Sequence, residues 1–264
     1  MTEPSILVFD SGLGGLTVFR EVVKARPDAR YVYAADDAFY PYGRLAQDAL
    51  LERVPDVIGG LIDEHAPDLV VVACNTASTV VLPRLRERFS VPFVGTVPAI
   101  KPACAMSKSR RVSVLGTPGT VEREYTQALI RDFGAGCDVL LVGSDALADL
   151  AEASLRGKAV DDASILCEIA PCFVDADGRR TDVVVLACTH YPLLLERLEA
   201  LQLWPVDWLD PAPAIARRVA DLLGPASTRT PSSIPPRIVF TSGTAPSPEL
   251  AQALRGFGFG ASPD

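Results

Sequence analysis

The sequence predicts an α/β protein made of two similar lobes, each built on a doubly wound parallel sheet. Two observations predict this class. Short Val-rich runs alternate with amphipathic stretches along the chain, a pattern typical of parallel strands covered by helices. In addition, one phrase occurs twice: Asp68 to Thr76 reads DLVVVACNT, and Asp182 to His190 reads DVVVLACTH. The repeat indicates two related lobes, each with a buried strand that ends at a cysteine.

The first lobe is predicted over residues 1–97. Apolar runs predict strands at 6–9, 31–35, 69–73 and 92–95. Apolar residues at helical spacing predict helices over 16–25 and 47–64, and a third helix after the third strand. A Gly-rich turn (10–15) and a loop (36–43) follow the first two strands, at the sheet edge where ligands bind in such folds.

The second lobe is predicted over residues 98–209, with strands at 111–115, 138–142 and 183–187. Helices are expected up to residue 130, around 147–152, over 165–173 and over 192–201. Residues 210–264 hold a helix (215–223), a Pro/Ser/Thr-rich linker (225–236) and a strand (237–240). One extra strand suits the first lobe better, so the tail is expected to return there.

Composition narrows the class of protein. The chain has 264 residues, is 48% hydrophobic and 22% charged, and carries a formal net charge of −8, which argues against nucleic acid as the main partner. The start, MTEPSILVFD, lacks the basic region of a secretory signal, and no apolar stretch approaches the ~20 residues that span a bilayer. We therefore expect a cytoplasmic protein with reduced cysteines and no membrane partner.

Cys74 and Cys188 occupy matching positions at the carboxyl ends of two predicted strands. A helix is expected to begin at each, and a helix N-terminus lowers the pKa of a thiol. One thiolate can then act as general base while the opposing thiol acts as general acid. Two thiols on opposite sides of one substrate could move a proton from one face to the other. The remaining cysteines are interpreted as small apolar side chains: Cys104, Cys137, Cys167 and Cys172.

The Gly-rich turn reads DSGLGG and begins with Asp10 and Ser11. Such turns often bind phosphate, which makes a nucleotide-binding module one alternative. The spacing is not Gly-x-Gly-x-x-Gly, however, and the carboxylate of Asp10 would repel phosphate. Asp10 is better suited to contact an ammonium group or to orient and deprotonate a thiol. Ser11 suits a helix N-cap and can also contact substrate.

Other strand-end residues complete the candidate site. His190 lies two residues after Cys188 and could tune it, whereas His65 is interpreted as structural. The turn at 41–43, PYG, is either a rigid turn or a lid. No lysine occupies a strand-end motif, so no organic cofactor is expected, and the cysteine and histidine spacing predicts no metal site. Hydroxyl and amide donors that suit a carboxylate are Asn75, Thr76, Thr120 and Thr189.

These motifs resemble those of glutamate racemases. The matching segments are FDSGLGGLTV (9–18), PYG (41–43), ACNTAS (73–78), Gly116 and Thr117 with Thr120, and CTHYPL (188–193). The resemblance runs from residue 6 to about 243. It implies two flavodoxin-like lobes closing over glutamate, with the active site between them and the tail on the first lobe. It also implies cofactor-independent racemisation that supplies D-glutamate for peptidoglycan, commonly by a homodimer.

The resemblance also implies roles for individual residues. Cys74 and Cys188 would be the acid/base thiols, attacking D- and L-glutamate respectively. Asp10 would assist Cys74, while His190 and Glu152 would assist Cys188. One departure, Asp210-Pro211 where the family often has Asp-Ser, bears on the junction of the lobes. The residues expected to hold substrate are Asp10, Ser11, Tyr42, Gly43, Asn75, Thr76, Thr120, Thr189 and His190.

Several other functions stay open at this point. A racemase of the same superfamily acting on aspartate or a hydantoin would share the fold and the thiols. A related decarboxylase would need only one cysteine, so the pair argues against it. A non-catalytic regulator on the same fold, such as the gyrase inhibitors reported within the family, is a different class, and the intact thiol pair argues against a purely regulatory role.

Overall fold

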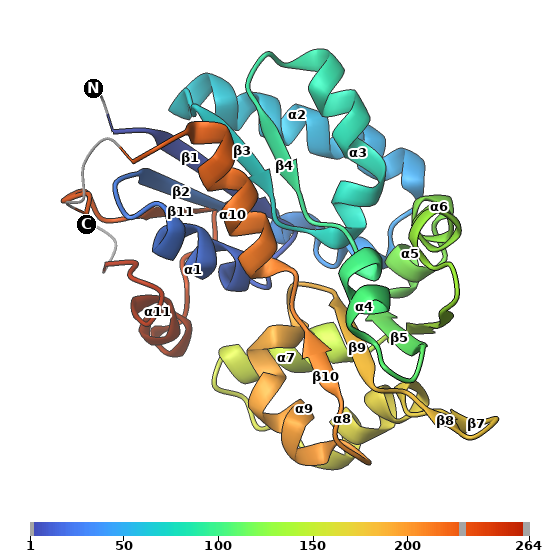
Figure 1. The fold of residues 1–264 in the computed structure, drawn as a ribbon. Coiled ribbons are helices and arrows are strands. Elements are labelled where there is room, and N and C mark those ends of the chain that lie inside the picture. The colour runs from blue at the N-terminus through green and yellow to red at the C-terminus, as the bar shows by residue number, and fades with distance from the viewer. Residues whose placement is uncertain (1–2, 227–230, 261–264) are drawn as a thin grey trace.

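The computed structural model describes residues 3–226 and 231–260. The chain forms two lobes, each built around its own parallel sheet (Figure 1). The predicted α/β class with two doubly wound lobes is therefore confirmed. Part of the predicted linker, residues 227–230, lies outside the described residues. Within the described ranges, no helix combines the length and apolar character needed to cross a bilayer.

The first sheet has the strand order β11-β2-β1-β3-β4, with every neighbouring pair parallel. Its register aligns Asp10 with Ala35 and Phe9 with Val72, so these strands end at one edge. The last strand in the chain lies beside β2 and reaches that same edge, with Phe240 opposite Ala35. The strands are β1 (Ser5–Asp10), β2 (Arg30–Ala35), β3 (Leu69–Val72), β4 (Phe93–Gly95) and β11 (Arg237–Phe240).

Successive side chains along the strands of this sheet pack alternately into two apolar cores. Ile6 and Val8 face one core, together with apolar residues of the first, tenth and eleventh helices. Leu7 and Phe9 face the other, beneath the second and third helices. This alternation is the period-2 pattern of a strand buried on both faces. The helices are α1 (Leu16–Ala25), α2 (Gln47–His65), α3 (Asn75–Arg88), α10 (Ala212–Leu223) and α11 (Pro248–Arg255).

The second sheet has the order β10-β9-β5-β6 and is also parallel. Gly116 aligns with both Ala187 and Gly143, which places the chain after each strand at one edge. A two-stranded hairpin, β7 (Asp175–Ala176) and β8 (Arg179–Arg180), projects from this lobe (Figure 1). The sheet strands are β5 (Arg111–Gly116), β6 (Asp138–Gly143), β9 (Val183–Ala187) and β10 (Asp207–Leu209).

Two predicted helices of the second lobe are shorter than expected. The stretch 165–173 is helical only to the end of α8 (Asp162–Ile169), because Pro171 interrupts it and the chain continues as a 3-10 turn, Ala170–Cys172. The stretch from residue 192 likewise begins as a 3-10 turn, Tyr191–Leu194, before α9 (Leu195–Leu201). The remaining helices are α4 (Ile100–Met106), α5 (Pro118–Val121), α6 (Glu124–Phe133) and α7 (Leu147–Leu155).

Candidate active site

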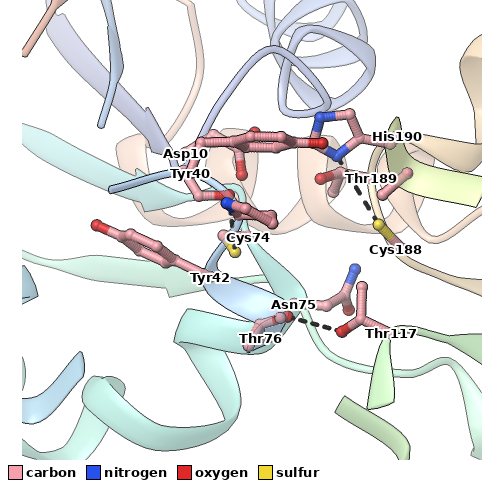
Figure 2. Close-up of a pocket in the computed structure, with 14 residues that line it drawn as sticks. Asp10, Tyr40, Tyr42, Cys74, Asn75, Thr76, Thr117, Cys188, Thr189 and His190 are labelled. Carbon is pink, nitrogen blue, oxygen red and sulfur yellow. Dashed lines mark hydrogen bonds between the residues drawn. The ribbon is translucent and has the colours of Figure 1, made fainter. Parts of the chain in front are cut away.

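The carboxyl-end edges of the two sheets bound a shared cavity of about 310 Å³, a volume that includes space open to solvent. The first lobe contributes its Gly-rich turn, the loop after β2 and the start of α3, and the second lobe contributes the chain after β5 and β9 (Figure 2). The lining residues are Asp10, Ser11, Tyr40, Pro41, Tyr42, Gly43, Cys74, Asn75, Thr76, Thr117, Ala148, Cys188, Thr189 and His190.

Both repeat cysteines line this cavity, each from its own lobe. Cys74 follows β3 and is the N-cap of α3, and Cys188 follows β9. Their side chains are buried, 6% and 7% exposed, and neither forms a disulfide. Figure 2 shows the two sulfur atoms on different sides of the cavity. The arrangement presents two thiols to one bound molecule.

The environment of Cys74 corrects one expectation. Its Sγ lies 3.7 Å from the hydroxyl of Ser11. Burial, and after it the charge of Asp10, raises the pKa of Cys74, although contacts at the start of α3 and with Ser11 act in the opposite direction. The expected lowering of this pKa by the helix N-terminus is therefore wrong, because removal from water outweighs it. Without a ligand, Cys74 is a thiol.

Two amides of the Gly-rich turn donate to the carboxylate of Asp10. Asp10 Oδ2 accepts hydrogen bonds from the amides of Gly15 (2.9 Å) and Gly12 (3.3 Å). Oδ1 is buried and has no hydrogen-bond partner. Burial raises the pKa of Asp10, against the charge of His190 and the amide bonds, which lower it. An unpartnered buried carboxylate oxygen in a cavity wall is suited to receive a cationic group.

His190 links Cys188 to a carboxylate. Its Nδ1 lies 3.8 Å from Cys188 Sγ, and its Nε2 lies 2.8 Å from Glu152 Oε2. The amide of Gly14 also lies 3.1 Å from Nε2. One nitrogen cannot donate to the carboxylate and accept from the amide at once. The shorter, charge-assisted contact with Glu152 indicates that Nε2 carries a proton. Nδ1 is then left to exchange a proton with Cys188.

Glu152 stays ionised behind the histidine. Arg156 Nη2 contacts its Oε1 at 2.8 Å, and the amide of Leu13 donates to Oε2 at 3.3 Å. Although burial alone raises it, the bonds to His190 and Arg156 hold the pKa of Glu152 at about 2. Burial lowers the pKa of His190, but its bonds to Cys188 and Glu152 outweigh burial and raise that pKa well above 6.5. Glu152, His190 and Cys188 thus form a chain of contacts in which the raised pKa favours the protonated form of the imidazole.

Polar side chains without charge line the wall near α3. The amide of Asn75 is buried, and neither its oxygen nor its nitrogen has a hydrogen-bond partner. Thr76 Oγ1 lies 3.0 Å from Thr117 Oγ1 and 3.1 Å from Thr120 Oγ1. Thr120 is fully buried behind this pair and does not line the cavity. Thr189 does line it, and its carbonyl accepts the hydroxyl of Thr17 across the lobes.

The loop after β2 forms one wall of the cavity, and the sequence predicted only some of its lining residues. Tyr42 and Gly43, both predicted to hold substrate, line the cavity, and the Tyr42 hydroxyl donates to Asp36 at 2.5 Å. Tyr40 was missed, although it directly precedes the PYG motif. Its ring centroid lies 5.6 Å from that of His190 and its hydroxyl donates to Asp149 at 3.0 Å. The other lining residues not expected to hold substrate are Pro41, Thr117 and Ala148.

Glu152 and the metal-binding potential of the chain complete the description of the site. Glu152 contacts His190 but is not part of the lining, so it could act only through the imidazole. Among residues 3–226 and 231–260, no group of three or more His, Cys, Asp or Glu side chains is arranged to hold a metal ion. The ionisable side chains that line the cavity are those of Asp10, Tyr40, Tyr42, Cys74, Cys188 and His190.

The chain is similar in sequence and in fold to known racemases. A family model described as Asp/Glu/Hydantoin racemase matches residues 10–219. A glutamate racemase of Brucella canis is 52% identical over 257 residues, 97% of this chain and 93% of that one. A glutamate racemase of Brucella anthropi is 58% identical over 224 residues, 84% and 81% of the two chains. The Escherichia coli glutamate racemase, solved with L-glutamate and the activator UDP-MurNAc-ala, superposes with a TM-score of 0.89 at 39% identity, covering 97% and 96%.

Proposed function

The chain belongs to the glutamate racemases of the Asp/Glu/hydantoin racemase family, and we propose that it interconverts L- and D-glutamate by proton transfer between Cys74 and Cys188. It is an isomerase of the amino-acid racemase class. The observation that carries the two-thiol mechanism is the pair of buried cysteines, one from each lobe, that line a single cavity. Each thiol has its own acid–base neighbours, Asp10 for Cys74 and His190 for Cys188.

Racemisation of L-glutamate begins at Cys188 in this proposal. The proton of Cys188 moves to His190 Nδ1, and Glu152 stabilises the resulting imidazolium through Nε2. The thiolate removes the α-proton, and the electron pair of the broken C–H bond is delocalised into the α-carboxylate. Cys74, a thiol at rest, donates its proton to the opposite face of the planar carbanion. D-Glutamate reacts in the opposite sense: Asp10 takes the proton of Cys74, the Cys74 thiolate removes the α-proton, and the Cys188 thiol donates its proton to the opposite face.

Binding of the substrate supplies the charge that Cys74 needs in the reverse direction. The free Oδ1 of Asp10 suits the substrate ammonium, and that positive charge favours both the carboxylate and a nearby thiolate. The uncharged donors suit the two carboxylates, with Thr120 acting through Thr76. The residues assigned to substrate binding are Asp10, Ser11, Tyr42, Gly43, Asn75, Thr76, Thr120, Thr189 and His190.

The wider assignment follows from the same family membership. We propose that the enzyme needs no organic cofactor, supplies D-glutamate for peptidoglycan, acts in the cytoplasm and forms a homodimer. We also propose lobe boundaries at residues 1–97 with 210–264 and 98–209. The parallel pairing of β11 with β2 supports assigning the tail to the first lobe.

The test is α-proton exchange in deuterated buffer, followed by NMR, with L-glutamate, D-glutamate and L-aspartate assayed separately and no added cofactor. Two thiols predict that early product carries deuterium at Cα while the remaining substrate keeps protium, because the delivered proton comes from the solvent-exchanged opposing thiol. Cys74→Ser and Cys188→Ser should each lower kcat by at least ~100-fold, since a hydroxyl is a far weaker acid than a thiol. The exposed Cys167→Ser is the matched control.

The outcomes separate the alternatives. A Cys188→Ser variant that racemises glutamate at the wild-type rate would contradict the two-thiol mechanism. Exchange on aspartate alone would retain the mechanism and change the substrate. No exchange on any of the three, from folded and reduced protein, would favour a regulatory role for the fold.

A further inference from the structure

Another buried carboxylate, Asp36, lies beside Tyr42 of the cavity wall and has no role in the proposed proton transfer. It directly follows β2, and its amide donates to the carbonyl of Asp10 at 2.8 Å. Its side chain is fully buried, and both carboxylate oxygens accept hydrogen bonds. Oδ2 accepts the hydroxyl of Tyr42 at 2.5 Å and Arg53 Nε at 3.1 Å. Oδ1 accepts Arg53 Nη2 at 2.7 Å and the hydroxyl of Thr241 at 2.6 Å.

These contacts keep Asp36 ionised in spite of its burial. Burial raises its pKa, but the hydrogen bonds from Arg53, Thr241 and Tyr42 together lower it below 3.8. The guanidinium of Arg53 is itself held 4.0 Å from the ring centroid of Phe39. An ionised acceptor binds a hydroxyl more firmly than a neutral one does. Tyr42 is therefore held by a charge-assisted bond on the side of its ring away from the thiols (Figure 2).

One of the four bonds comes from the far end of the chain. Thr241 directly follows β11, and its hydroxyl also accepts the amide of Ala38 at 3.4 Å. The next residue, Ser242, donates its amide (2.9 Å) and hydroxyl (2.6 Å) to the carboxylate of Asp37. The end of β11 thus bonds to the start of the loop whose later residues, Tyr40 to Gly43, line the cavity.

We propose that Asp36 and Thr241 are positioning residues, which fix the Tyr42 wall of the cavity so that the C-terminal strand helps to set substrate affinity. The proposal rests on the proposed function. Tyr42 is 1% exposed and packs on Phe9, with ring centroids 6.5 Å apart, so this packing and the hydroxyl bond to Asp36 together fix the ring and the adjoining Gly43 in the cavity wall. Neither positioning residue lines the cavity, and neither is assigned to substrate contact.

Thr241→Val tests this, because it keeps the side-chain shape and removes the hydroxyl. We expect KM for both enantiomers to rise about tenfold with kcat changed less than about twofold, since a binding wall acts on ground and transition states alike. Thr241→Ser should restore KM, because it returns the hydroxyl. Thr244→Val makes the same substitution on an exposed side chain three residues on, and it should leave KM unchanged.

A double-mutant cycle separates positioning from general weakening of the fold. If Thr241 acts through Asp36 on Tyr42, then Thr241→Val should add little to the KM of Tyr42→Phe, in which the hydroxyl bond is already absent. Additive effects in this cycle, or an unchanged KM in Thr241→Val, would overturn the inference. Both of these outcomes are measured while the wild-type protein still racemises glutamate. A wild type that does not racemise glutamate would overturn the proposed function as well, so the two failures are distinguishable.

Discussion

At the scale of single residues, the site depends on glycines that leave room for ionisable side chains. A Cβ built on Gly14 would lie 2.3 Å from His190 Nδ1, and one on Gly15 would lie 2.8 Å from Asp10 Cβ. Real Cβ contacts are not this short, so each glycine lets a backbone segment of the first lobe approach a catalytic candidate closely. The close packing of His190 and Asp10 therefore explains why glycine is needed at these two positions of the turn.

Gly14→Ala should displace the ring of His190 and separate Nδ1 from Cys188. We expect kcat to fall by at least ~100-fold, because in the proposed mechanism the imidazole must lie where it can receive the proton of Cys188. Steady-state kinetics in both directions measures this. The enantiomers have equal free energies, so kcat/KM must fall by the same factor for each. Gly60→Ala, where a Cβ would meet nothing within 4 Å, is the control, and wild-type kcat in Gly14→Ala would contradict the role of His190.

At the scale of elements, the loop after β2 and helix α7 close the cavity from opposite lobes. Asp149 of α7 accepts the hydroxyl of Tyr40 and forms an ion pair with Arg44 at 2.7 Å. Arg44 also donates to the carbonyl of Asp145. These contacts border a second cavity of about 270 Å³ that shares Pro41, Gly43, Thr117 and Ala148 with the first. The contact between Arg44 and Asp149 therefore lies beside the wall that the two cavities share.

Asp149→Ala should loosen that closure without unfolding the protein. The Arg44–Asp149 pair is well exposed, 57% and 41% on its two sides, so we expect less than about 1 kcal/mol of lost stability. KM for glutamate should rise about threefold or more, because Tyr40 loses the partner that holds it against His190. Kinetics and chemical denaturation check both parts. Asp162→Ala, which breaks an exposed ion pair with Arg197 away from the cavity, should change neither, and an unchanged KM in Asp149→Ala would contradict the idea.

At the scale of the whole molecule, the candidate site is also part of the contact between the lobes. Glu152 and His190 of the second lobe meet the amides of Leu13 and Gly14 of the first. The ionisable groups of the proposed proton relay therefore also take part in lobe packing. A change in the charge of Glu152 would affect the stability of the folded chain as well as the proton relay.

Acid should consequently destabilise the protein through Glu152. Its pKa is held at about 2, below the 4.5 of an unperturbed carboxyl, so its contribution is present above pH 4.5 and is lost as the pH falls toward 2. Between about pH 6 and pH 3, wild type should lose on the order of 2 kcal/mol more unfolding free energy than Glu152→Gln. Urea denaturation at the two pH values measures this.

The control for the acid effect is Glu199→Gln, which removes an exposed carboxylate of the same lobe. It should follow the wild-type dependence on pH. If wild type and Glu152→Gln lost equal unfolding free energy, the ion pairs of Glu152 would not stabilise the fold. Glu152 would then have no place in the proposed relay.

Much of the architecture could be predicted because its signals are local. Apolar runs predicted the strands β1 to β6, β9 and β11, and the turn residues after several of them indicated the edge where the cavity forms. Strand β10 and the hairpin β7–β8 were not predicted, because short runs such as Asp207–Leu209 and Asp175–Ala176 carry too few residues to show a period. The two shortened helices follow from Pro171 and Pro192, whose effect depends on the turn they occupy.

By itself, the sequence determined the two-lobed α/β class, the strand-end positions of Cys74 and Cys188, and the motifs that indicate the family. Local pattern suffices for these, because period, turn residues and strand ends are properties of neighbours in the chain. Only the tertiary structure decided that the pKa of Cys74 is raised, that Glu152 meets His190, and that Thr241 reaches Asp36. Each of these depends on burial, or on contacts between residues far apart in sequence, and the free energy of a charge depends on what surrounds it in space.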